Sequence, residues 1–151
     1  MKILIIGNLG YIGPLVVEHL RLLYPNSVLV GFDIGYFNHA LTTKDRLAET
    51  KLDIQYFGDV RNFQDDIIKD VDSVVYLAAI SNDPMGNEFE SVTRDVNYKS
   101  ALKIAKVAKD FGVSNYVFAS SCSVYGAGGN KDKTEDDKVN PLTEYELCRF
   151  G

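Results

Sequence analysis

Three glycines near the amino terminus have the spacing of a phosphate-binding turn. Gly7, Gly10 and Gly13 follow a GxxGxxG pattern directly after an apolar run that ends at Ile6. Glycines at these positions permit a tight turn, let the backbone approach a pyrophosphate and allow a helix to pack closely on a strand, while the helix N-terminus offers N–H groups to the anion. By itself, the pattern also fits an ordinary strand-to-helix turn. The residues around it decide between these two interpretations.

A carboxylate follows at the distance that a dinucleotide site requires. Asp33 ends the apolar run Val30-Gly31-Phe32 and stands about 20 residues after Gly13. An acid at the end of a second strand accepts hydrogen bonds from both ribose hydroxyls of the adenosine and repels a 2′-phosphate. No Arg or Lys stands between Asp33 and Lys44 to offset that repulsion. The pattern predicts NAD(H) rather than NADP(H); the alternative is that Asp33 is only a loop acid at a strand end.

A parallel sheet covered by helices would bring these residues together. Short β-branched runs alternate with amphipathic stretches, which is typical of βαβ units with strands buried on both faces. We expect strands over residues 2–6, 27–32, 54–57, 73–77 and 115–120, and helices over 11–24, over 88–111 and from 143 onward. The predicted fold class is α/β, a Rossmann-type doubly wound parallel sheet that stops after about five strands. Residues 1–151 are expected to form one incomplete NAD-binding domain.

The periodicity of apolar residues predicts which helix faces are buried. In the first helix it selects one face, made of Ile12, Leu15, Val16, Leu20 and Leu23. In the second helix it selects Asn97, Ala101, Ile104, Ala105, Ala108 and Phe111. Gly112 can then end this helix in a left-handed conformation. Thr143 and Glu146 have the spacing of a capping box at the start of the third helix.

With these elements in place, nearly the whole chain resembles the extended short-chain dehydrogenase/reductase family, specifically its NAD-dependent nucleotide-sugar epimerases and dehydratases. The resemblance covers the glycine motif, the acid of the second strand, the segment Gly58-Asp59-Val60-Arg61 and the end of the fourth strand. It implies ten contacts to the cofactor: Gly7, Gly10, Tyr11, Ile12, Gly13, Asp33, Asp59, Val60, Ala78 and Ala79. Asp59 would contact the adenine, and Val60 would line the same pocket.

Asn97 completes the expected cofactor set. It matches an asparagine that borders the active site in the family, on the helix after the fourth strand. Judged without the resemblance, an asparagine on an apolar helix face is more often a hydrogen-bonded core residue.

The resemblance also implies a catalytic set. Residues 118–126 resemble the motif at the end of the fifth strand, with Ser121 at the catalytic Ser/Thr position, and Tyr145 matches the catalytic tyrosine. Four residues after that tyrosine the family has a lysine, whose charge stabilises the phenolate from one helical turn away. This chain has Arg149 there, and a guanidinium is planar, wider and always protonated, so the change is not conservative. Without the family, Tyr145 and Arg149 are an ordinary i, i+4 pair.

In such an enzyme, Tyr145 would take a proton from a sugar hydroxyl while hydride passes to NAD+, and Ser121 would hydrogen-bond the reacting oxygen. The keto sugar would then be reduced from either face, which makes a nucleotide sugar the expected substrate. Related dehydratases usually have an Asp-Glu pair where this chain has Cys122 and Ser123, so epimerase or reductase chemistry is favoured. Two alternatives stay open: a non-catalytic NAD(H)-binding or interaction module, and an NAD-dependent reductase of another hydroxyl or carbonyl substrate.

Composition argues against several other classes of protein. The net charge of −5, with Lys and Arg scattered among Asp and Glu, predicts no nucleic-acid partner. No apolar run approaches the roughly 20 residues that span a bilayer, and no signal-peptide pattern begins the chain, so no membrane partner is expected. Cys122 and Cys148 lack metal-binding spacing and paired histidines, which predicts no metal site and a reducing, cytoplasmic location.

The chain is about half as long as members of this family, whose second half carries further strands and the sugar-nucleotide pocket. We therefore expect the fifth strand, around residues 116–119, to present an apolar edge and to make the chain self-associate into homo-oligomers. A terminal helix of about eight residues is too short to be stable alone, so Tyr145 and Arg149 should fray unless they pack.

Overall fold

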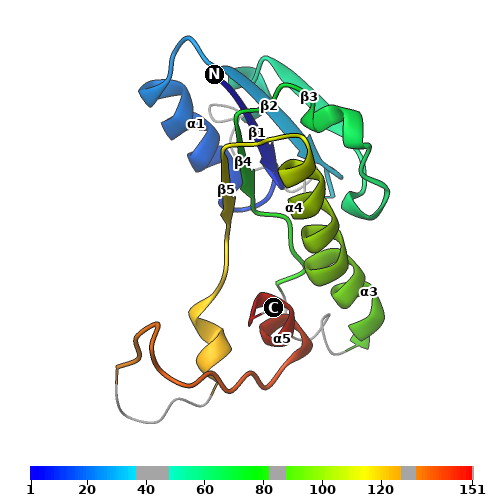
Figure 1. The fold of residues 1–151 in the computed structure, drawn as a ribbon, viewed down its shortest axis with the longest axis vertical. Helices are drawn as coiled ribbons and strands as arrows, with labels where there is room; N and C mark the ends of the chain where they lie inside the picture. Colours follow the sequence, from blue (N-terminus) through cyan, green and yellow to red (C-terminus); the bar gives the residue numbers. More distant parts are fainter. Residues whose placement is uncertain (37–47, 82–87, 127–131, 151) are drawn as a thin grey trace.

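Five parallel strands form the centre of the part of the chain that the computed structural model describes, residues 1–36, 48–81, 88–126 and 132–150. They are β1 (Lys2–Ile6), β2 (Val28–Asp33), β3 (Ile54–Phe57), β4 (Ser73–Tyr76) and β5 (Asn115–Phe118). Their order in the sheet is β3-β2-β1-β4-β5 (Figure 1), so the winding direction reverses between β1 and β4. In open α/β sheets, ligands bind outside the carboxyl ends of the strands at such a reversal. The predicted Rossmann-type α/β fold is confirmed.

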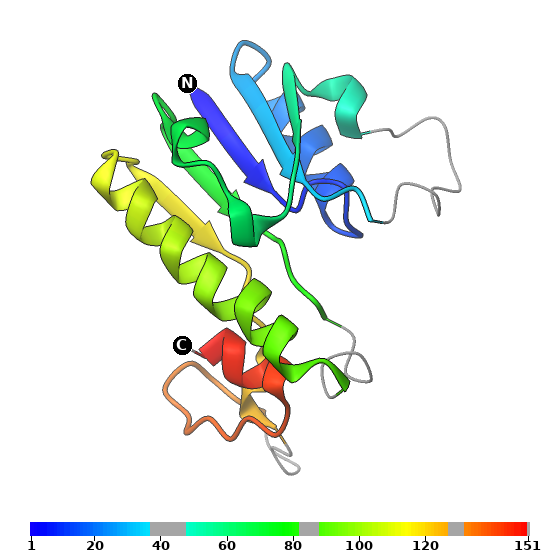
Figure 2. The ribbon, with the colours of Figure 1, turned by 90° about the vertical axis from the view of Figure 1, so that its right-hand side faces the viewer.

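Helices lie on both faces of the sheet (Figure 2). On one face α1 (Gly13–Leu23) and the 3-10 helix η2 (Ala48–Lys51) cover a cluster that includes Ile5 and Leu29. On the other face lie α4 (Ser100–Asp110) and the 3-10 helices η3 (Val60–Asn62) and η4 (Asp65–Ile68), around a larger core. The doubly wound arrangement is therefore present.

The buried face of α1 differs from the prediction. Val17 is fully buried and Leu20 packs against the core, but Ile12, Leu15 and Leu23 are all more than half exposed. The apolar stripe of this helix is wide, and its orientation is fixed by close packing of Gly13 on the preceding turn rather than by the average position of the stripe.

The long helix predicted over residues 88–111 is interrupted by a wider turn. α3 (Glu90–Arg94) continues into a π-helical turn, η5 (Asp95–Lys99), and then into α4. The Ser100 hydroxyl donates to the Asp95 carbonyl at 2.7 Å, which supports the wider turn from the side. π-helical turns inside helices are frequent at functional sites. As predicted, Gly112 ends α4 with a positive φ of 77°, whereas Phe111 is exposed rather than buried.

The last helix, α5 (Glu144–Phe150), packs instead of standing alone. Its predicted capping box is present: Thr143 Oγ1 accepts from the Glu146 N–H at 3.3 Å, and Glu146 Oε2 accepts from the Thr143 N–H at 3.1 Å. α5 contacts α3, η5 and the 3-10 helix η6 (Cys122–Tyr125), and Cys148 and Arg149 are buried. These contacts stabilise the helix, which is too short to be stable alone.

β5 ends the sheet, because among the described residues it pairs only with β4. Val117 of this strand is 56% exposed. We expect the 151-residue chain to self-associate through this edge, and Val117→Lys to reduce association because charged edge residues oppose strand pairing. Sedimentation at increasing protein concentration measures this self-association. Leu22→Lys on α1 is the control and should still associate. A monomer at high concentration would contradict the prediction.

Candidate functional site

The glycines of the turn after β1 have two different structural roles. Gly7 has a positive φ of 87°, and a Cβ there would lie 2.5 Å from the Ala78 nitrogen. A Cβ on Gly13 would lie 2.2 Å from the Asn8 carbonyl oxygen. Gly10 is different, since the nearest heavy atom to its Cβ position is the Gly7 oxygen at 3.5 Å, an ordinary contact. The packing of the protein itself requires glycine at 7 and 13, while Gly10 leaves open the space that a pyrophosphate needs.

The same turn presents unused N–H groups to this space. Among the described residues, none accepts a hydrogen bond from the N–H groups of Tyr11 and Ile12. Their side chains are 97% and 55% exposed, so they do not cover the turn. Free N–H groups at the start of a helix are the arrangement that binds phosphate. The predicted cofactor residues of this segment therefore fit the diphosphate of NAD.

The carboxylate of Asp33 lies beside the glycine turn. Its Oδ2 accepts from the Leu9 N–H at 3.0 Å, and its Oδ1 accepts from the Gly35 N–H at 2.7 Å. Two backbone donors thus fix the side chain at the carboxyl end of β2. The structure confirms that this acid lies next to the glycine turn, as its spacing predicted. Its contact with the adenosine ribose stays a prediction.

The ends of β3 and β4 complete this edge of the sheet. Asp59 caps η3 by accepting from the Arg61 N–H at 2.9 Å, and hydrogen bonds from the Arg61 guanidinium lower the pKa of its carboxyl. Val60 is buried in the core beneath it. After β4, Ala78 runs against Gly7, and Ala79 leads to Ile80.

Asn97 holds the chain that leaves β4. Its Oδ1 accepts from the Ile80 N–H at 2.8 Å, and its Nδ2 donates to the Ile80 carbonyl at 2.9 Å. The side chain is fully buried in the π-helical turn η5. Asn97 is thus a hydrogen-bonded core residue that positions the segment after Ala79, and a direct contact to the cofactor stays a prediction.

The expected catalytic residues lie on neighbouring elements. Ser121 caps η6, and its Oγ lies 2.8 Å from the Ser123 Oγ. The Ser120 hydroxyl donates to the Arg149 carbonyl at 3.0 Å, which attaches α5 to the end of β5. Because α5 also packs on η6, the structure brings the helix of Tyr145 to the segment of Ser121. None of the described hydrogen bonds joins the side chains of Tyr145 and Ser121 directly.

The guanidinium of Arg149 is enclosed and incompletely paired. The residue is only 5% exposed, and its guanidinium carbon lies 5.0 Å from the Phe118 ring centroid and 5.3 Å from that of Tyr145. Within the described part of the chain, Nε and Nη1 have no hydrogen-bond acceptor. A buried charged group with unpaired donors is costly and commonly marks a functional position.

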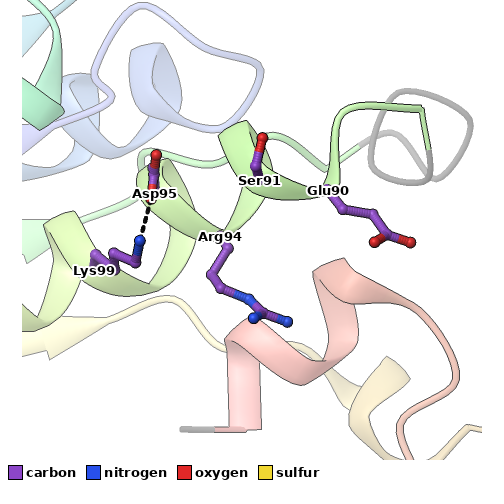
Figure 3. Close-up of a pocket in the computed structure, with 5 residues that line it drawn as sticks. All are labelled: Glu90, Ser91, Arg94, Asp95 and Lys99. Atoms are coloured by element: carbon purple, nitrogen blue, oxygen red, sulfur yellow. Dashed lines mark ion pairs between the residues drawn. The ribbon is translucent and has the colours of Figure 1, made fainter.

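An ion pair that could not be predicted from local sequence anchors the start of α5. Arg94 Nε and Nη2 donate to the two carboxylate oxygens of Glu144 at 2.7 and 3.0 Å. This bond lowers the pKa of Glu144, while burial raises the pKa of the neighbouring Cys148 thiol to about 11. Figure 3 shows Arg94 extending from α3 towards α5. The pair fixes the residue directly before Tyr145.

A separate hollow lies along α3 and η5. It has a volume of about 320 Å³ and is lined by Glu90, Ser91, Arg94, Asp95 and Lys99 (Figure 3). None of the predicted cofactor or catalytic residues lines it, so it is a surface feature of the helix. The described residues contain no group of His, Cys, Asp and Glu that could hold a metal ion. They also contain no helix with the length and apolar character needed to cross a membrane.

The doubly wound sheet, the glycine turn and the acid at the end of β2 define a Rossmann-type dinucleotide-binding protein. The chain belongs to the NAD dependent epimerase/dehydratase family, whose model matches residues 3–150. The family is NAD-dependent, which confirms the predicted cofactor.

Known proteins similar to this chain include epimerases. A UDP-glucose 4-epimerase of Lactobacillus helveticus is 32% identical over 149 residues, covering 96% of this chain and 43% of that enzyme. The structure of a UDP-N-acetylglucosamine 4-epimerase from Methanobrevibacter ruminantium M1, in complex with UDP-N-acetylmuramic acid, matches with a TM-score of 0.84 at 22% identity, over 99% of this chain and 47% of that one. A short-chain dehydrogenase/reductase superfamily protein from Agrobacterium tumefaciens with bound NAD matches with a TM-score of 0.78 at 26% identity, over 99% and 42%. The chain spans less than half the length of the curated relatives it matches.

Proposed function

We propose that this chain is the NAD-binding part of a nucleotide-sugar epimerase that works through a keto-sugar intermediate. One observation carries the proposal: the elements that would bind the dinucleotide and the helix of Tyr145 are connected at the carboxyl ends of the strands. Gly7 contacts the segment after β4, Asn97 connects that segment to η5, and η5 packs on α5. The family and the 4-epimerases among the relatives support a nucleoside-diphosphate sugar as the substrate.

The residues of this chain would divide the work as follows. Bound NAD+ supplies the hydride acceptor. The N–H groups of Tyr11 and Ile12 would hold the diphosphate, and Asp33 would accept from the adenosine ribose. As its phenolate, Tyr145 would take the proton of the sugar hydroxyl and become the neutral phenol. The Ser121 Oγ, held by Ser123, would donate to the reacting oxygen. The Arg149 guanidinium would supply the positive charge beside the phenol.

Cofactor preference gives the first test. The Asp33 carboxylate at the end of β2 should repel a 2′-phosphate, so we expect NAD to bind at least about tenfold more tightly than NADP, a difference of about 1.4 kcal/mol. Asp33→Ser should narrow this ratio because it removes the charge. Calorimetric titration with both dinucleotides measures it, and tighter binding of NADP by the unchanged chain would overturn the assignment.

A second candidate function is a non-catalytic NAD-binding module, and Arg149, which stands where the family has a lysine, favours it. An assay of UDP-glucose conversion to its 4-epimer separates the two candidates when this chain is assayed together with the part of the enzyme that carries the sugar-nucleotide pocket. Epimerisation that is lost in Tyr145→Phe supports the enzyme. NAD binding without any turnover of nucleotide sugars selects the module.

A further inference from the structure

The side chain of Asn8 has an unusual position for a residue in an exposed turn. It stands between Gly7 and Leu9 of the phosphate-binding turn, yet it is fully buried. Its Nδ2 donates to the Gln55 Oε1 at 2.7 Å, and the Gln55 Nε2 approaches the Asn8 Oδ1 at 3.4 Å. The turn after β1 is therefore connected to β3, on the far side of β2, by a pair of amide side chains.

The surrounding glycines make room for this pair. Gly31 of β2 lies opposite Gln55 in the sheet register. A Cβ on Gly31 would lie 2.5 Å from the Gln55 Oε1 and 2.8 Å from the Asn8 Cγ. The backbone of Asn8 in turn fills the space where Gly13 lacks a Cβ. Asn8 is thus packed between the start of α1, the middle of β2 and the Gln55 side chain of β3.

We propose that the Asn8–Gln55 amide pair is a positioning device that fixes the phosphate-binding turn before the dinucleotide arrives. Asn8 directly precedes Leu9, whose N–H is bonded to Asp33, and the free N–H groups of Tyr11 and Ile12 follow on the same turn. A turn that is already fixed loses less conformational entropy when the diphosphate binds. The inference rests on the NAD binding of the proposed function and adds two residues, Asn8 and Gln55, to those that determine its strength.

Removal of the Asn8–Gln55 pair should affect ligand affinity differently if the pair is purely structural than if it positions the turn. If the pair only stabilised the domain, its removal would weaken every ligand equally or none of them. If it positions the turn, its removal should weaken ligands that carry a diphosphate. It should spare adenosine, whose ribose would bind Asp33, because the Gly35 N–H still holds that carboxylate. The ratio of the two affinities therefore distinguishes the roles.

The first experiment compares Asn8→Ala with the unchanged chain by hydrogen exchange, without ligand. We expect the Leu9 amide, protected by Asp33 in the unchanged chain, to exchange faster in the variant, while amides in the middle of β1 keep their protection. Equal protection of Leu9 in both proteins would overturn the proposal. This readout does not depend on NAD binding.

The second experiment is a double-variant cycle with Asn8→Ala, Gln55→Ala and both together. Each single change should weaken NAD and ADP about tenfold, the effect of one hydrogen bond, and adenosine by less than about twofold. The double variant should lose no more than either single variant, because the two amides act as one unit. Ile104→Val, on the buried face of α4, serves as the control, with lower thermal stability and unchanged NAD affinity.

Several results would overturn the inference. Additive losses in the double variant, or an equal loss for adenosine and ADP, would reduce the pair to a structural contact. Unchanged NAD affinity in Asn8→Ala would exclude the positioning role while leaving the proposed function intact. Failure of the unchanged chain to bind NAD would instead overturn the proposed function together with this inference.

Discussion

Gly10→Ala is expected to leave the fold intact and to remove most of the affinity for NAD. A Cβ at this position would meet only the Gly7 oxygen, at 3.5 Å, and Gly10 is not among the residues with positive φ. The free energy of unfolding should therefore change by less than about 1 kcal/mol. The added methyl group would occupy the open side of the turn, where the pyrophosphate must approach the backbone, so NAD affinity should fall about 100-fold, or about 2.7 kcal/mol. Thermal unfolding and calorimetry measure the two effects.

Gly13→Ala is the matched control for this experiment. The same methyl group at position 13 would lie 2.2 Å from a backbone oxygen that cannot move away without displacing the turn. We expect a loss of about 2–4 kcal/mol of stability there, whatever happens to the cofactor. If Gly10→Ala destabilised the chain as much as Gly13→Ala, or bound NAD normally, the assignment of Gly10 to the pyrophosphate would be wrong.

Most of the fold follows from the sequence because buried parallel strands are short apolar runs with clear ends. β1 and β3 have the predicted bounds, and β2, β4 and β5 differ from their predictions by one or two residues. The orientation of α1 could not be predicted in the same way. Periodicity defines a wide stripe, whereas the side that docks is fixed by Val17 and by the contact of Gly13 with Asn8, which depend on the neighbouring strands.

The candidate site was predictable where chemistry lies in a local motif and unpredictable where distant residues meet. Gly7, Gly13 and Asp33 belong to a spacing that can be recognised in one sequence. The partners in the Asn8–Gln55 and Arg94–Glu144 pairs are 47 and 50 residues apart, and no periodicity connects them. The π-helical turn around Asn97 likewise has no local signature, because the i, i+3, i+4 pattern continues through it.

The long-range pairs share a function that the local motifs do not have. Asn8 and Gln55 hold the turn at one end of the site, and Arg94 and Glu144 hold the helix at the other end. Both sets lie beneath or beside the groups that would touch a ligand, and they reduce the freedom of those groups before binding. In the proposed function, the motif residues would supply the chemistry, and these pairs would supply its geometry.

Arg149→Met is expected to make the chain more stable and at the same time to weaken NAD. In the described part of the chain, the guanidinium has two nitrogens without acceptors and is almost completely buried. Each unmade bond of a buried group costs about 1–3 kcal/mol, while the attraction to the Phe118 and Tyr145 rings returns about 1–2 kcal/mol each. With the desolvation of the charge added, the balance favours the neutral side chain by about 1–3 kcal/mol, or a rise of about 2–12 °C in Tm.

The expected loss of NAD affinity concerns the nicotinamide half of the dinucleotide, which ADP lacks. If the unpaired nitrogens of Arg149 serve the nicotinamide half, Arg149→Met should weaken NAD about tenfold, the value of one charge-assisted hydrogen bond, and leave ADP unchanged. Arg149→Lys is the control, since it keeps the charge and should retain most of the NAD affinity. A fall in Tm for Arg149→Met would show that the two rings already satisfy the cation. Equal affinity of both proteins for NAD would show that the unpaired nitrogens of Arg149 do not contact the cofactor, and would leave Arg149 only the charge beside Tyr145.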